Sequence, residues 1–132
     1  MVDTKTKKIR LSYFISENIL SDIKSDMNQR NYDLKSKSKW ISEAVEAFFD
    51  LRNFIELVMI NDQMHGFEKL DSISIERSLK TRLDSSVIDV RKTYPALEGV
   101  QSKIVRAAII QRLLGVTMPL YEPFDGVLEP TT

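Results

Sequence analysis

The chain has 132 residues and a mass of 15.2 kDa, which is the usual size of one domain. It contains no cysteine and a single histidine, His65. This composition excludes a disulfide framework, a thiol nucleophile, a cysteine-based zinc site and a multi-histidine metal site within one chain. We therefore expect no catalytic residues, no enzymatic activity, no bound metal and no cofactor.

Charge is balanced overall but unevenly distributed along the chain. The 19 basic and 19 acidic residues give a net charge of zero, whereas nucleic-acid-binding domains are usually basic. Residues 1–10 and 30–40 nevertheless carry +3 each, and residues 43–71 carry −5. Charge alone leaves a nucleic-acid binder and an ordinary solvated surface equally open. No apolar run approaches the roughly 20 residues of a membrane span, and no secretory signal is visible, so we expect a cytoplasmic protein.

The first predicted element is a strand at residues 9–15. Side chains alternate there with a period of two, which is typical of a strand with one buried face. The expected inward residues are Ile9, Leu11, Tyr13 and Ile15, and the expected outward residues are Arg10, Ser12 and Phe14. Ser16 then provides an N-cap for a helix over residues 17–30.

A second helix is predicted to begin at Ser38, after a polar break at residues 31–37. Its apolar side chains recur at helical spacing and predict a wide buried stripe. These side chains are Ile41, Ala44, Val45, Phe48 and Phe49. The helical pattern can extend through Val58. Residues 61–74 are predicted to be a connector, with His65 exposed to solvent.

The second half of the chain is predicted to repeat this order. Alternation over residues 78–83 indicates a second strand. The expected inward residues are Leu79, Thr81 and Leu83, and the expected outward residues are Ser78, Lys80 and Arg82. Asp84 is the expected N-cap of the next helix, which ends near Pro95. A last helix is expected to open at Gln101 or Ser102 and to close at Gly115.

The two halves therefore read as an internal repeat of strand, helix, turn and helix. The second helix of each half opens with the pattern Ser-x-x-[Ile/Val]-x-x-Ala, at Ser38 and at Ser102. The predicted organisation is one domain at 1–115, with repeat one at 8–60, a connector at 61–74 and repeat two at 75–115, followed by an irregular, acidic, proline-containing tail at 116–132.

These motifs resemble the ribbon-helix-helix family of DNA-binding proteins, of the MetJ and Arc type. Residues 79–84 resemble the strand and cap of that family, whereas Phe14 departs from it because a polar residue is usual there. The resemblance implies a mainly α-helical fold with a two-stranded antiparallel β-ribbon, in which tandem repeats form an intramolecular pseudo-dimer. The tandem layout is similar to accessory proteins of conjugative relaxosomes and of T-DNA processing.

In such a fold the outward face of the ribbon enters the major groove, and the N-termini of the second helices bind phosphates. The expected base contacts are Arg10, Ser12, Phe14, Ser78, Lys80 and Arg82. The expected phosphate contacts are Lys8, Lys37, Ser38, Lys39, Gln101, Ser102 and Lys103.

The resemblance thus implies sequence-specific binding to double-stranded DNA, either as a DNA-transfer accessory factor or as a transcriptional regulator. The expected partners are DNA, a relaxase or another DNA-processing protein, and further copies of the chain on DNA, with no membrane. The alternative is a protein-interaction module of the same fold that does not bind DNA, which the zero net charge and the outward Phe14 favour.

Overall fold

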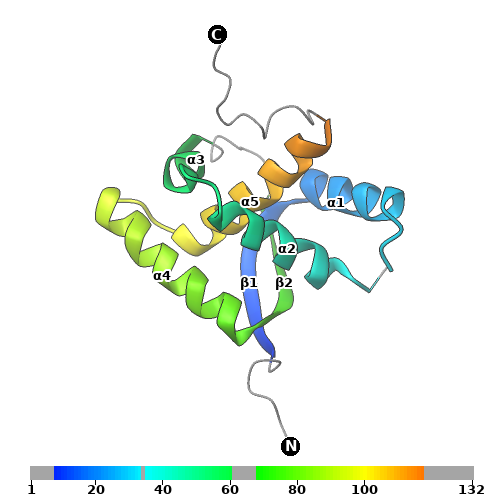
Figure 1. Cartoon of the computed structure of the whole chain (residues 1–132), viewed down its shortest axis with the longest axis horizontal. Helices are drawn as coiled ribbons and strands as arrows, with labels where there is room; N and C mark the ends of the chain where they lie inside the picture. The colour runs from blue at the N-terminus through cyan, green and yellow to red at the C-terminus, as the bar shows by residue number, and fades with distance from the viewer. Residues whose placement is uncertain (1–7, 34, 61–67, 118–132) are drawn as a thin grey trace, which may run out of the picture.

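The computed structural model describes residues 8–33, 35–60 and 68–117. The chain is mainly helical around one two-stranded ribbon (Figure 1). The elements in order are β1 (Lys8–Ser16), α1 (Glu17–Gln29), α2 (Lys37–Phe49), α3 (Phe54–Ile60), β2 (Glu68–Glu76), α4 (Arg77–Thr93) and α5 (Val100–Thr117).

The two strands pair antiparallel along their whole length, although 51 residues separate the end of β1 at Ser16 from the start of β2 at Glu68. Ser12 lies opposite Ser72 at the centre of the ribbon, and Lys8 lies opposite Glu76 at one end. Alternation of burial along both strands gives the ribbon one buried face and one exposed face. The buried face rests on helices, and the exposed face is left open.

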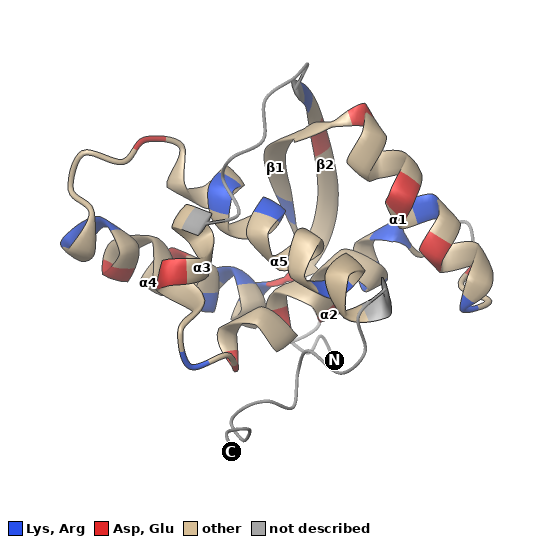
Figure 2. Ribbon diagram, turned by 90° about the horizontal axis from the view of Figure 1, so that it is seen from above, with Lys and Arg blue, Asp and Glu red and all other residues tan. Residues whose placement is uncertain are grey.

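The core lies between the ribbon and helices α2 and α5, which pack against each other and against the strands. Its largest fully buried side chains include Trp40, Tyr13, Phe48, Leu11, Ile15, Ile75 and Leu83. Each such aliphatic or aromatic side chain contributes about 1.5–3 kcal/mol on burial. Helices α1 and α4 lie on opposite sides of the ribbon in both views (Figures 1 and 2).

The beginning of the chain folds as its pattern predicts. Leu11, Tyr13 and Ile15 are buried in β1, and the Ser16 hydroxyl caps α1 by accepting a hydrogen bond from the amide of Ile19 at 3.3 Å. The predicted polar break after α1 is also confirmed, with Asn31 in the left-handed region at a φ of 63°.

The prediction of a second strand at residues 78–83 is wrong, because these residues form part of α4. Leu79 and Leu83 fit a helix spaced i, i+4 as well as a strand, and they continue into a helical stripe through Val90. Thr81, which the alternation placed inward, is exposed, and its hydroxyl donates to the carbonyl of Arg77 one helical turn earlier.

The second strand lies in the segment that was predicted to be a connector. Within β2 only Ile73 and Ile75 are buried apolar residues. The inward position before them is occupied by Asp71, which interrupts the apolar pattern and conceals the strand. Asp84 is therefore not an N-cap but a residue inside α4, where it accepts a hydrogen bond from Lys80 at 2.5 Å.

Three helix boundaries also differ from the prediction. The N-cap position of α2 is Ser36 rather than Ser38, and the hydroxyl of Ser38 has a different role, described below. The second helical pattern breaks between Phe49 and Phe54, which separates α2 from α3. Helix α5 continues through Gly115 to Thr117. Within the described residues no helix is long and apolar enough to cross a membrane. The predictions for His65 and for the tail beyond Thr117 lie outside the described residues.

Candidate nucleic-acid interface

The exposed face of the ribbon consists of cross-strand rows of side chains. In order along the ribbon the described rows are Lys8 with Glu76, Arg10 with Ser74, Ser12 with Ser72, and Phe14 with Leu70. One end of this face is charged, its centre carries hydroxyl groups, and the other end is apolar. We call these eight side chains the ribbon face.

The ribbon face carries the groups that read base edges in the major groove. An arginine donates two hydrogen bonds to guanine O6 and N7, and serine hydroxyls donate to or accept from several bases. The major groove, about 12 Å wide, admits a two-stranded ribbon. Arg10, Ser12 and Phe14 therefore stand where the sequence predicted them, outward on a strand.

The outer edges of the ribbon are covered by the first turns of α2 and α5. The amide of Ser74 on β2 donates to the hydroxyl of Ser38 at 3.1 Å, and the amide of Phe14 on β1 donates to the hydroxyl of Ser102 at 3.0 Å. A free strand edge presents unpaired amides that favour aggregation, so these two serines protect opposite edges of the ribbon.

Two further side chains of α5 hold the edge of β1. Gln101 Nε2 donates to the carbonyl of Ser12 at 3.0 Å, and Arg106 Nη1 donates to the carbonyl of Phe14 at 2.8 Å. Arg106 is only 6% exposed, so its guanidinium lies beneath the ribbon rather than in solvent. The backbone around Phe14 is fixed from below by α5.

The inner face of the ribbon contains an ion pair that anchors α2. Lys37 Nζ lies 2.8 Å from Asp71 Oδ1, and Asp71 Oδ2 accepts a hydrogen bond from the Tyr13 hydroxyl at 2.5 Å. Burial alone would raise the pKa of Asp71, but the hydrogen bonds from Lys37 and Tyr13 outweigh it and hold that pKa below its usual value. Burial, together with the hydrogen bond to Asp71, raises the pKa of Tyr13 well above its ordinary range.

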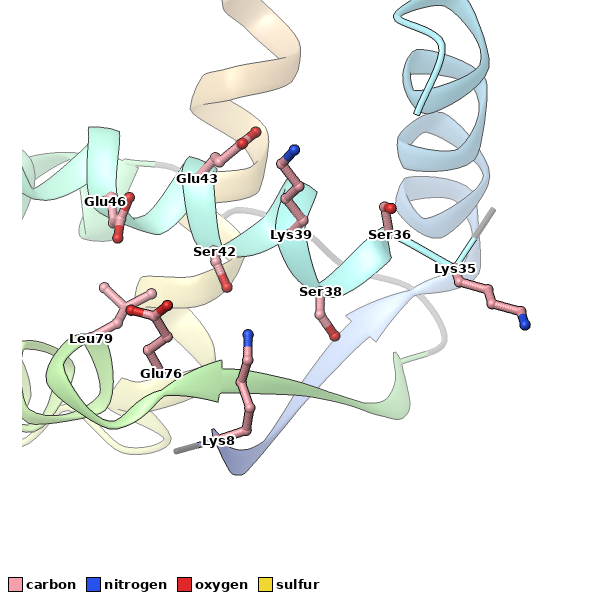
Figure 3. A pocket seen from close by; sticks show the side chains of 10 residues that line it. All are labelled: Lys8, Lys35, Ser36, Ser38, Lys39, Ser42, Glu43, Glu46, Glu76 and Leu79. Carbon is pink, nitrogen blue, oxygen red and sulfur yellow. The ribbon is translucent and has the colours of Figure 1, made fainter. Parts of the chain in front are cut away.

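An open polar hollow of about 380 Å³ lies between β2 and the start of α2. Its lining residues are Lys8, Lys35, Ser36, Ser38, Lys39, Ser42, Glu43, Glu46, Glu76 and Leu79. Figure 3 shows the Lys8 side chain rising from the ribbon toward α2, whereas Lys35 points away from the hollow. The hollow therefore brings one ammonium group close to the first turn of α2, where backbone amides are unpaired within the helix.

The predicted phosphate contacts divide into two groups. Lys37, Ser38, Gln101 and Ser102 are bonded to the ribbon itself and serve to attach the helices to it. Lys8 and Lys39 are exposed beside the ribbon, and Lys103 is half-buried near the start of α5. The ammonium of Lys39 lies 5.8 Å from the centre of the Tyr32 ring.

Three of the predicted base contacts do not lie on the ribbon. Ser78, Lys80 and Arg82 are on α4; Lys80 pairs with Asp84, and an Arg82 nitrogen lies 3.6 Å from a carboxylate oxygen of Asp50. Their place on the ribbon face is taken by residues of β2 that the sequence reasoning missed. These residues are Leu70, Ser72, Ser74 and Glu76. The alternation of Ser72 and Ser74 with two β-branched isoleucines was the signal that could have identified them.

Across the described residues, no group of three or more histidine, cysteine, aspartate or glutamate side chains could hold a metal ion. Comparison of the chain with protein-family models, with curated proteins and with solved structures found no match. The functional interpretation therefore depends on the geometry of the ribbon and its surroundings.

Proposed function

We propose that this chain is a sequence-specific double-stranded DNA-binding protein of the ribbon-helix-helix type that inserts its ribbon face into the major groove. The observation that carries the proposal is the ribbon face itself: Arg10, Ser12, Ser72 and Ser74 point outward from a two-stranded ribbon whose other face is buried. Such a ribbon needs no exposed polar rows for stability, whereas base reading needs them.

The arrangement of the elements supports two repeats within one chain. Strands β1 and β2 have nine residues each, begin 60 residues apart at Lys8 and Glu68, and run directly into helices. Residues 60 apart in sequence meet at the middle of the ribbon, where Ser12 faces Ser72.

The serine contacts follow the same relation between the halves. Ser38 of the first half bonds the amide of Ser74, and Ser102 of the second half bonds the amide of Phe14, which is again 60 residues from Ser74. A pseudo-twofold axis through the Ser12–Ser72 pair accounts for both contacts. We infer an intramolecular pseudo-dimer.

The cellular role that we propose is accessory to DNA transfer, next to a relaxase or a similar DNA-processing protein, or else transcriptional regulation. Both roles require the same binding to a specific duplex, and further copies of the chain could bind adjacent sites. A DNA-binding sequence located within a transfer origin would favour the first role, and one within a promoter would favour the second.

The decisive experiment is selection of a preferred duplex from a random pool, followed by titration against that duplex and a scrambled one at several salt concentrations. We expect preferential binding whose affinity falls as salt rises, because phosphate contacts release counterions. Equal affinity for both duplexes would contradict sequence-specific recognition.

The second candidate function is a protein-interaction module of the same fold. Pairing of cationic side chains with carboxylates favours it, since Lys37 is bound to Asp71 and Arg82 lies beside Asp50. No detectable binding to any duplex at low salt would support this second function over the first.

A further inference from the structure

The ribbon face ends in an apolar pair. Phe14 and Leu70 lie directly opposite each other and are 48% and 60% exposed. The other large apolar side chains that are exposed in the described residues, Ile88 and Leu114, lie on helices. Phe14 and Leu70 are therefore two apolar neighbours on a face whose adjacent rows carry hydroxyls and a guanidinium.

From this pair we infer that the Phe14–Leu70 end of the ribbon face recognises thymine through its C5-methyl group, whereas the Arg10 end recognises guanine. This inference rests on the proposed DNA binding and names the bases that each end would select. The thymine methyl is the apolar group that a base presents in the major groove, and apolar side chains contact it.

The backbone at Phe14 is held in place before any ligand binds. Its amide is bonded to Ser102 and its carbonyl to Arg106, both from α5. The ring is thus carried on a fixed strand and points outward from it. A side chain presented in this way loses less conformational freedom on binding than one on a loop.

The two ends of β1 are too far apart to contact one base pair. Arg10 and Phe14 are four residues apart, which is about 13 Å along a strand at 3.3 Å per residue. Base pairs in B-DNA are separated by about 3.4 Å. Arg10 and Phe14 would therefore meet different base pairs, and a site with guanine at one end and thymine at the other would satisfy both.

A protein partner fits the apolar pair poorly. A stable protein interface buries about 800 Å² on each partner, with an apolar centre. Here the apolar surface on the ribbon face consists of two side chains, and the next row holds the hydroxyls of Ser12 and Ser72. An apolar group of one or two methyls, set among hydrogen-bonding base edges, matches this pattern better.

The test is replacement of thymine by deoxyuridine, one position at a time, in the preferred duplex. This change removes one methyl group and leaves the hydrogen-bonding edge intact. We expect deoxyuridine at one end of the site to weaken binding of the unaltered protein about three- to fivefold per methyl group. The variants Phe14→Ser and Leu70→Ser should lose this sensitivity, since serine already occupies the neighbouring rows.

Two matched variants complete the design. Ile88→Ser removes an exposed apolar side chain from α4 and should keep the full response to deoxyuridine. Arg10→Ala should also keep it while losing discrimination at the other end of the site. If deoxyuridine has no effect at any position, or has the same effect on Phe14→Ser and Leu70→Ser as on the unaltered protein, thymine recognition is overturned while DNA binding stands. Absence of any preferred duplex would overturn both proposals.

Discussion

At the scale of single residues, the structure separates cations that face outward from a strand from cations that are held by carboxylates. Arg10 is exposed on the ribbon face. Arg82 lies on α4, between Asp50 and the ring of Phe49, whose centre is 5.1 Å from the guanidinium carbon. Two arginines that the sequence pattern treated as equivalent therefore have different surroundings and different expected roles.

We expect Arg10→Ala to reduce the discrimination between the preferred and scrambled duplexes by about 1–3 kcal/mol, which is the usual value of a bidentate contact to a base. Arg82→Ala is the matched control and should leave discrimination unchanged, because its side chain is not on the ribbon face. Binding titrations of both variants against both duplexes measure the difference. A larger loss for Arg82→Ala would contradict the assignment of the ribbon face.

The Asp71 carboxylate makes stability depend on acidity. Because the folded protein holds the pKa of Asp71 below its usual value, the carboxylate stabilises the fold above that usual pKa, and the effect is lost as pH falls through the folded-state pKa. We expect the Tm of Asp71→Asn to lie below that of the unaltered protein at neutral pH, with the gap closing below about pH 4. Thermal melts from pH 7 to pH 2 measure this gap.

The control for this measurement is Glu17→Gln. Glu17 pairs with Lys69 at 3.3 Å, but the two side chains are 72% and 55% exposed. Exposed ion pairs contribute about 0–1 kcal/mol. A gap between Asp71→Asn and the unaltered protein that stays constant over the whole pH range would show that the ion pair with Lys37 does not produce the effect.

At the scale of elements, the sequence predicted β1, its cap and the buried stripe of α2, because each had a complete period and an unambiguous end. It failed at β2, whose inward positions include the polar Asp71. Asp71 is tolerated there because Lys37 and Tyr13 satisfy it, and neither partner is near it in sequence. A pattern of residue types cannot reveal such a partner before the chain is folded.

The candidate site was predicted in part for the same reason. The outward half of β1 follows from alternation alone, and it was predicted correctly. Whether Ser38 and Ser102 face a phosphate or the edge of the ribbon depends on how closely α2 and α5 approach the strands. That approach is a property of tertiary packing, so the motif that the two helices share did not specify it.

The new position of the second strand is open to a stability measurement. Ile75 is buried in β2, so Ile75→Ala should lower the free energy of unfolding by about 2–5 kcal/mol. Thr81 is exposed on α4, so Thr81→Ala should change it by about 0.7 kcal/mol or less, toward greater stability, since alanine is the better helix former. Denaturant titrations compare the two. A cost for Thr81→Ala as large as that for Ile75→Ala would restore the strand at residues 78–83.

At the scale of the whole molecule, neither half of the chain has a complete core. Strand β1 pairs with β2 from the other half, and α2 packs against α5. We expect a fragment of residues 1–62 to be unfolded or to associate with itself, because its strand has no partner and its apolar stripe is uncovered. Circular dichroism and sedimentation of the fragment measure both properties. A folded monomeric fragment would contradict the dependence of each half on the other.

Both strands of the ribbon belong to one covalent chain, and this has a consequence at low concentration. A ribbon assembled from two separate subunits disappears on dilution, because the folded state of an obligate dimer depends on the amount of protein present. Here the partner strand is always attached, so the ribbon stays complete in a cell that holds only a few copies of the protein. Occupancy of a single duplex site should then rise in simple proportion to protein at low concentration, rather than with its square.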